Sequence, residues 1–129
     1  MDHLVDTCAL LLFLENSPRL PEAAAARIEN SKSRSFVSLV SLWEIAIKVS
    51  IGKLRFDHAQ RLDLPELLNA NGFEVIAPNW QVLSRSSFLP YHHRDPFDRV
   101  LVSECHLRSL PLISSDAKLD AYQITRLWS

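Results

Sequence analysis

The stretch SFVSLVSLWEIAIKVSIG, residues 35–52, contains the two patterns that decide the fold class. Its first four residues, Ser-Phe-Val-Ser at 35–38, predict a short strand. Residues 39–51 repeat apolar side chains three and four positions apart, which predicts an amphipathic helix, and Gly52 is the residue type expected just past its end. A strand followed directly by a helix is typical of the repeating unit of α/β proteins.

The same alternation extends over the whole chain. Further strands are predicted at 3–5, 73–77, 110–114 and 123–128, and further helices at 8–14, 22–30, 65–70, 79–88 and 96–108. The last helix has a strong start signal, because Asp95 can cap it and Pro96 suits its first position. With 129 residues, the pattern predicts one α/β domain over residues 1–129 with a mainly parallel sheet.

The composition excludes several classes of protein. Gly52 and Gly72 are the only glycines, so neither of the glycine-rich phosphate-binding motifs can be present. The net charge of −1 gives no overall basic excess, although the stretches 48–61 and 85–99 are locally basic. The longest apolar run, 8–14, is too short to span a bilayer and lacks the basic start of a signal peptide. We therefore expect a soluble, cytoplasmic protein with no membrane contact.

Cys8 and Cys105 are the only cysteines. They are too few for a structural zinc site, and they lack the spacing of a disulfide framework, so we expect reduced thiols. Cys8 lies in the apolar run, which predicts a small buried side chain.

Four acidic residues are notable for their places in the predicted elements. Asp6 ends the first strand and Asp116 follows the fourth, while Glu44 and Asp98 lie in the first turns of two helices. In a parallel sheet these places meet at the carboxyl ends of the strands. Clustered carboxylates repel one another unless a hard cation neutralises them, so we expect Mg²⁺ or Mn²⁺ there. Such an ion can activate water for attack on a phosphate.

Each acid also has a structural explanation of its own. Ser41 and Glu44 match the capping box S-x-x-E, and Asp98 at the third helical position gains from the helix dipole. Asp6 and Asp116 could form turns with their own backbone. The coincidence of four acids at one edge favours a metal site over four separate local roles.

Four stretches around these acids resemble PIN-domain proteins, and more narrowly the VapC-type ribonuclease toxins of prokaryotic toxin–antitoxin pairs. They are LVDT (4–7), SLVSLWEI (38–45), HRDPFDR (93–99) and LISSD (112–116). The resemblance runs from residue 3 to the C-terminal tryptophan. It implies a three-layer α/β/α sandwich, a nuclease centre that depends on Mg²⁺ or Mn²⁺, RNA as the substrate and a cognate antitoxin as the partner.

The resemblance also implies roles for individual residues. The catalytic and metal-binding acids of the family fall on Asp6, Glu44, Asp98 and Asp116. Supporting positions fall on Thr7, Ser114 and Asp95, and Asp120 is offset from the place where relatives often add another acid.

Basic and apolar side chains suggest the contacts with RNA and with protein partners. The candidates for contacts to RNA phosphates are Lys48, Lys53, Arg94 and Arg99. We expect His92 and His93 at the surface or against phosphate rather than as catalytic bases. The helices 8–14 and 39–51 carry more large apolar side chains than one buried face needs, which predicts an interface and a homodimer. The alternative is that both helices are covered on two sides within the domain.

Two other functions fit the same acids. A receiver-like or other Mg²⁺-binding regulatory domain would need a lysine after a late strand, for which Lys118 is the nearest candidate. A non-catalytic scaffold would use the acids only as helix caps. RNA cleavage by the purified protein, with an alanine control at Asp6, distinguishes these functions from a metal-dependent endoribonuclease.

Overall fold

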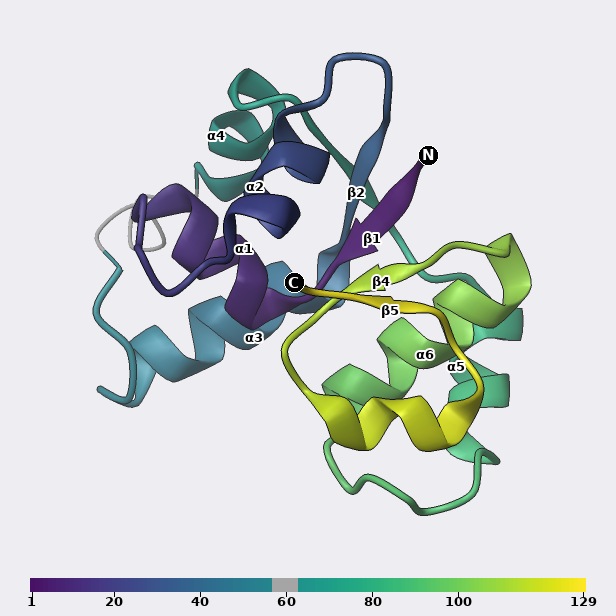
Figure 1. The fold of residues 1–129 in the computed structure, drawn as a ribbon. Coiled ribbons are helices and arrows are strands. Elements are labelled where there is room, and N and C mark those ends of the chain that lie inside the picture. The colour runs from purple at the N-terminus through teal and green to yellow at the C-terminus, as the bar shows by residue number, and fades with distance from the viewer. Residues whose placement is uncertain (57–62) are drawn as a thin grey trace.

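A computed structural model of the chain describes residues 1–56 and 63–129, so the end of the basic stretch 48–61 lies outside the described residues. Within these ranges five strands form one sheet in the order β3-β2-β1-β4-β5, and every neighbouring pair is parallel (Figure 1). The strands are β1 (His3–Val5), β2 (Ser35–Ser38), β3 (Phe73–Ile76), β4 (Leu112–Ile113) and β5 (Arg126–Leu127). The predicted parallel sheet is confirmed.

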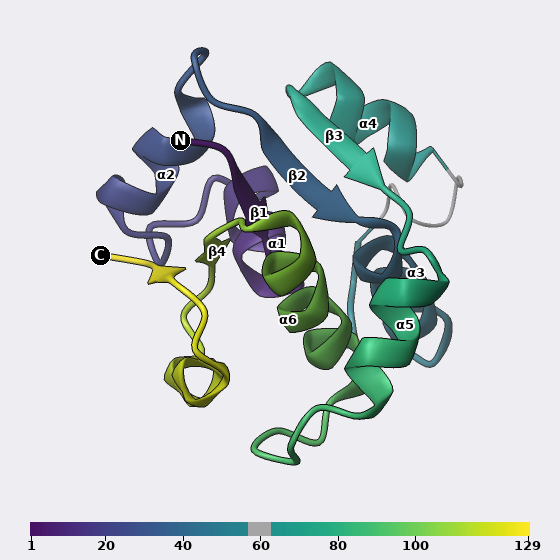
Figure 2. The same ribbon diagram turned by 90° about the vertical axis from the view of Figure 1, so that its right-hand side faces the viewer.

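Helices cover both faces of the sheet. They are α1 (Thr7–Leu14), α2 (Glu22–Glu29), α3 (Leu39–Ser50), α4 (Leu64–Ala70), α5 (Trp80–Ser87), α6 (Pro96–Arg108) and the 3₁₀ helix η2 (Ala117–Tyr122). Figures 1 and 2 show α1, α2 and α4 on one side of the sheet, with α5 and α6 on the other. This arrangement is the three-layer α/β/α sandwich that the sequence predicts.

The alternation of side chains along each strand builds the two hydrophobic cores. Val5 and its neighbour Ile113 pack into the core beneath α1, α2 and α4. Leu4 and its neighbour Leu112, one residue earlier, pack on the opposite face against α6 and η2. Because both faces of β1 and β4 are covered, these strands are buried throughout and, apart from His3, apolar, as expected for a parallel sheet.

The predicted strands at 110–114 and 123–128 are shortened in the structure, and η2 was not predicted. Leu110 still donates its backbone N–H to Cys105 in the last turn of α6, so β4 begins only at Leu112. Gln123 has a left-handed backbone with φ of 60° and ends η2, which delays β5 to Arg126. In both places, residues that the apolar pattern predicts in a strand belong instead to the end of the preceding helix.

The described helices are all too short or too polar to cross a membrane.

Candidate functional site

The topology gathers residues at the carboxyl ends of β1 and β4. Residues 4 and 5 of β1 pair with 112 and 113 of β4, so Asp6 and Ser114 leave the sheet side by side. From β1 the chain moves to β2 on one side, while β4 lies on the other side. A crevice forms where strand order reverses in this way, and open α/β sheets bind ligands there.

An acidic cavity of about 360 Å³ lies at this edge of the sheet. Its lining comprises Asp6, Thr7, Cys8, Leu11, Glu44, Lys48, Lys53, Leu54, Asp95, Asp98, Ser115 and Asp116. All four predicted acids are therefore brought together, along with Asp95. A larger hollow of about 710 Å³ lies at the amino ends of the strands, and Asp2 is the one acid in its lining.

Asp6 and Asp98 carry the strongest electrostatic perturbation in the acidic cavity. Burial raises the pKa of Asp6 to about 6, and the charges of Glu44 and Asp116 add to this increase, while a hydrogen bond from Ser114 opposes it. Burial likewise raises the pKa of Asp98 to about 7, with Asp95 and Asp6 as further causes. These carboxylates are held close together at an energetic cost, which a bound cation would remove.

This cost predicts how the stability of the metal-free protein depends on pH. Both carboxyls bind protons more tightly in the folded state, so the free energy of unfolding should fall as the pH rises from about 4 to about 7. One pKa unit corresponds to about 1.4 kcal/mol, so Asp98→Asn should stabilise the protein by about 1–3 kcal/mol at pH 8. The same change should have little effect at pH 4. Urea unfolding in the presence of EDTA at the two pH values measures the difference, and equal effects at both would contradict the raised pKa.

Helix starts position four of the five acids that line the acidic cavity. Asp6 caps α1 by accepting a hydrogen bond from the backbone N–H of Ala9 at 2.8 Å. Asp95 caps α6 through the N–H of Phe97, as the sequence predicts, and Asp98 follows at the third position of that helix. Asp116 precedes η2, accepting from Lys118 N–H, while its own N–H donates to the hydroxyl of Ser114. A capping role therefore coexists with a place in the acidic cavity.

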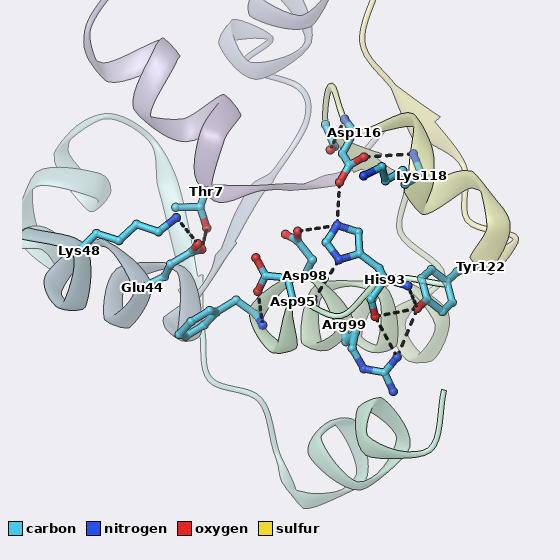
Figure 3. Close-up of polar contacts among 12 residues, drawn as sticks. Thr7, Glu44, Lys48, His93, Asp95, Asp98, Arg99, Asp116, Lys118 and Tyr122 are labelled. Carbon is cyan, nitrogen blue, oxygen red and sulfur yellow. Dashed lines mark hydrogen bonds and ion pairs between the residues drawn. The ribbon is translucent and has the colours of Figure 1, made fainter. Parts of the chain in front are cut away.

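Glu44 does not close a helix end, and the capping-box explanation is wrong. The N-cap of α3 is Ser38, so Glu44 is the sixth residue of the helix and lies in its second turn. Its buried carboxylate accepts a hydrogen bond from the Thr7 hydroxyl at 2.7 Å and pairs with Lys48 at 2.7 Å. Both partners line the acidic cavity, so these two contacts of the carboxylate belong to the site (Figure 3).

The four basic candidates lie in three different settings. Lys48 and Lys53 line the acidic cavity, and a Gly52 turn with φ of 75° at the end of α3 carries Lys53 there. Arg94 lines a different hollow, beside Tyr91. Arg99 is 4% exposed and its terminal nitrogens donate to backbone carbonyls, so it is corrected from a phosphate contact to a structural residue.

Two further predictions change. Cys8 is exposed rather than buried, because as the second residue of α1 it faces the acidic cavity while Ala9 and Leu10 face the core. Asp120 pairs with Arg126 at 2.9 Å and is not among the residues that line the acidic cavity.

Sequence reasoning missed the place of His93. Its Nε2 atom lies 2.9 Å from Asp116 Oδ2 and 3.4 Å from Asp98 Oδ2, so the ring lies between two of the candidate ligands (Figure 3). The ligand atoms of these three residues all lie within 4.8 Å of one another. The one signal in the sequence was the position of His93 at the start of the HRDPFDR stretch.

The donor set of the acidic cavity suits a hard divalent cation. Carboxylate oxygens are the preferred ligands of Mg²⁺ and Mn²⁺, and five carboxylates line the cavity against two lysines. Two of those carboxylates have raised pKa values, chiefly because they are buried and further because of the neighbouring acids, and a bound cation would offset both causes.

The sequence matches the PIN domain family along residues 3–124, and the chain therefore belongs to the PIN domain family. No curated protein sequence matches it significantly.

Three solved structures are similar to the whole chain. VapBC-1 from nontypeable Haemophilus influenzae has a TM-score of 0.68 at 18% identity, covering 98% of this chain and 97% of that one. VapBC2 from Rickettsia felis, bound to a DNA fragment from its promoter, has a TM-score of 0.70 at 14% identity, with both chains fully covered. A toxin–antitoxin complex from Klebsiella pneumoniae has a TM-score of 0.60 at 20% identity, covering 92% and 90%. At these low sequence identities the likeness shows a shared fold and nothing more.

Proposed function

We propose that this protein is a VapC-type toxin: an endoribonuclease that hydrolyses RNA phosphodiester bonds with Mg²⁺ or Mn²⁺ and is restrained by an antitoxin. The observation that carries the proposal is the acidic cavity at the carboxyl ends of β1 and β4. Membership of the PIN domain family and the toxin–antitoxin complex among the similar structures support it.

The residues that line the acidic cavity would have different roles in catalysis. Asp6, Glu44, Asp98 and Asp116 would hold the cation, which supplies a Lewis acid that activates water and offsets charge on the leaving oxygen. Thr7 orients Glu44 through the 2.7 Å hydrogen bond, and Ser114 hydrogen-bonds Asp6.

Two further groups of residues would act around the metal ligands. Asp95 caps α6 at the start of the helical turn that carries Asp98. Lys48 and Lys53 would contact RNA phosphates, as would Arg94 from the neighbouring hollow. Phosphate contacts of this kind position the substrate without reading its sequence.

Cleavage of RNA by the purified protein tests the proposal. The parent should cleave a mixed RNA in Mg²⁺ or Mn²⁺ and stop when EDTA is added, and Asp6→Ala should be inactive in the same buffer. Cleavage that persists in EDTA, or at the parental rate in Asp6→Ala, would reject the proposed mechanism. Specific Mg²⁺ binding without any RNA cleavage would favour the regulatory alternative.

Thermal stability provides a prediction that does not depend on finding the right RNA. Millimolar Mg²⁺ or Mn²⁺ should raise the melting temperature, because a ligand that binds only the folded state stabilises it by about 1.4 kcal/mol at ten times its Kd. Asp98→Asn should reduce this increase. The matched control is Asp120→Asn, which changes an exposed acid outside the acidic cavity and should respond to the ions like the parent. A parent whose melting temperature ignores both ions would remove the basis for the metal site.

Apolar surface on α3 supports the proposal of protein partners. Trp43 on α3 is 62% exposed, and Ile51 at the end of that helix is 58% exposed. The large apolar residues of α1 were also predicted to form an interface, but they pack on the core instead. We propose that a second copy of the chain and an antitoxin segment bind to exposed apolar surface such as this. Light scattering should give twice the chain's 14.7 kDa, and a monomer at high micromolar concentration would contradict the dimer.

A further inference from the structure

We infer that His93 is a positioning residue, whose Nε2–H group bridges Asp98 and Asp116 and so fixes the two carboxylates that close one side of the acidic cavity. The inference rests on the proposed function, because it gives His93 a role toward the same metal-binding acids. It concerns a residue that the sequence predicts at the surface or against phosphate.

The bridge joins two separate elements of the fold. Asp98 belongs to α6 and Asp116 precedes η2, so the contacts of His93 at 3.4 Å and 2.9 Å hold these elements together across the site (Figure 3). The shorter contact has the length of a good N–H···O hydrogen bond, and the longer one is mainly electrostatic. Without a donor between them, the two carboxylates would repel each other and separate.

The tautomer of the ring makes His93 a donor rather than a ligand. Its Nδ1 atom lies 3.1 Å from the backbone N–H of Asp95 and accepts a hydrogen bond from it. A neutral imidazole that accepts at Nδ1 carries its proton on Nε2, the atom that faces Asp116. To coordinate a cation through Nε2, the ring would have to give up its contact with Asp95.

The backbone of His93 is fixed as firmly as its ring. Its N–H donates to the Tyr122 hydroxyl at 2.9 Å, and its carbonyl accepts from the Arg99 guanidinium at 3.3 Å. Both of these partners are buried. His92, the preceding residue, is exposed and packs edge-on against Tyr122, so it provides a natural control.

A residue in this position should act on metal affinity. Groups that hydrogen-bond to metal ligands set the orientation of those ligands, and their loss typically weakens metal binding about 10–100-fold. His93→Leu removes the donor but keeps an apolar side chain of similar bulk. His93→Gln places an amide N–H near the position of Nε2, whereas the shorter side chain of His93→Asn cannot reach it.

Calorimetric titration with Mn²⁺ tests the inference, together with RNA cleavage by the same samples. His93→Leu and His93→Asn should bind Mn²⁺ about 10–100-fold more weakly than the parent, whereas His93→Gln should stay within about threefold. His92→Leu should match the parent. If His93→Leu does not fold, the comparison of the asparagine and glutamine variants still decides the matter.

Metal affinity and RNA cleavage, measured on the same samples, distinguish a failure of this inference from a failure of the proposed nuclease activity. Parental affinity in His93→Asn, or equal losses in His93→Asn and His93→Gln, would overturn the positioning role. A parent that binds Mn²⁺ without cleaving RNA would overturn the nuclease while the graded affinities still support the role of His93. A parent that does not bind Mn²⁺ would overturn both.

Discussion

Replacing Glu44 with glutamine should remove metal-dependent RNA cleavage and leave the protein folded. Glutamine keeps the oxygen that accepts from Thr7, but it loses the negative charge that a cation needs and turns an amide toward Lys48. We expect cleavage to fall by at least about 10²–10³-fold, the loss typical of removing a single preorganised hydrogen-bond donor from a catalytic site. The free energy of unfolding should change by only about 1 kcal/mol, because the loss of the Lys48 pair is offset by weaker repulsion within the acidic cavity.

Glu74→Gln is the matched control for this experiment. Glu74 lies on β3, is largely exposed and pairs with Arg34 at 2.6 Å, so the same chemical change is made far from the acidic cavity. Initial rates of cleavage and urea unfolding should be measured on both variants. If Glu44→Gln cleaves RNA at the rate of Glu74→Gln, then Glu44 serves only to order α1 against α3 through Thr7.

The elements of the fold could be predicted from local patterns, whereas the sheet order could not. The helix start at Asp95–Pro96 and the end of α3 before Gly52 follow from backbone requirements of single residues, and both are present in the structure. The order β3-β2-β1-β4-β5 depends on which strands pair across long stretches of chain, which no local pattern encodes. The 3₁₀ helix after Asp116 was missed because its six residues are too few for a periodic pattern.

Asp6, Asp98 and Asp116 could be located from the sequence because each follows a recognisable strand or lies at the start of a helix. Glu44 lies in the second turn of α3 rather than in the first turn that the sequence predicts. The roles of their neighbours depend on tertiary packing instead. Arg94 and Arg99 look equivalent in the HRDPFDR stretch, yet one is exposed and the other is 4% exposed. His93 could not be placed either, because its position depends on a connector that Arg99 and Tyr122 fold back onto the site.

The connector between α5 and α6 is organised around the guanidinium of Arg99. Its Nη2 donates to the carbonyls of Ser86 and Leu89, each at 2.9 Å, and its Nη1 donates to those of Pro90 and His93. Tyr91 lies across the guanidinium, 4.1 Å from its carbon to the ring centroid. One buried side chain therefore donates to four carbonyl groups, one at the end of α5 and three in the irregular connector, where buried backbone groups need such partners.

Arg99→Met should consequently be among the most destabilising single substitutions in this protein. Methionine fills much of the space, but it leaves the carbonyls of Ser86 and Leu89 without these donors, at about 1–3 kcal/mol for each buried unsatisfied group. We expect a loss of about 3–4 kcal/mol and a fall in melting temperature of about 10 °C or more. Arg94→Met removes the same charge from an exposed position and should stay within about 0.5 kcal/mol of the parent. Melting curves of the two variants in EDTA make the comparison independent of metal binding. The expected difference in melting temperature between the two variants is roughly 10 °C. A difference of less than about 2 °C, on the same scale, would mean that contacts other than those of Arg99 hold the connector and His93 in place.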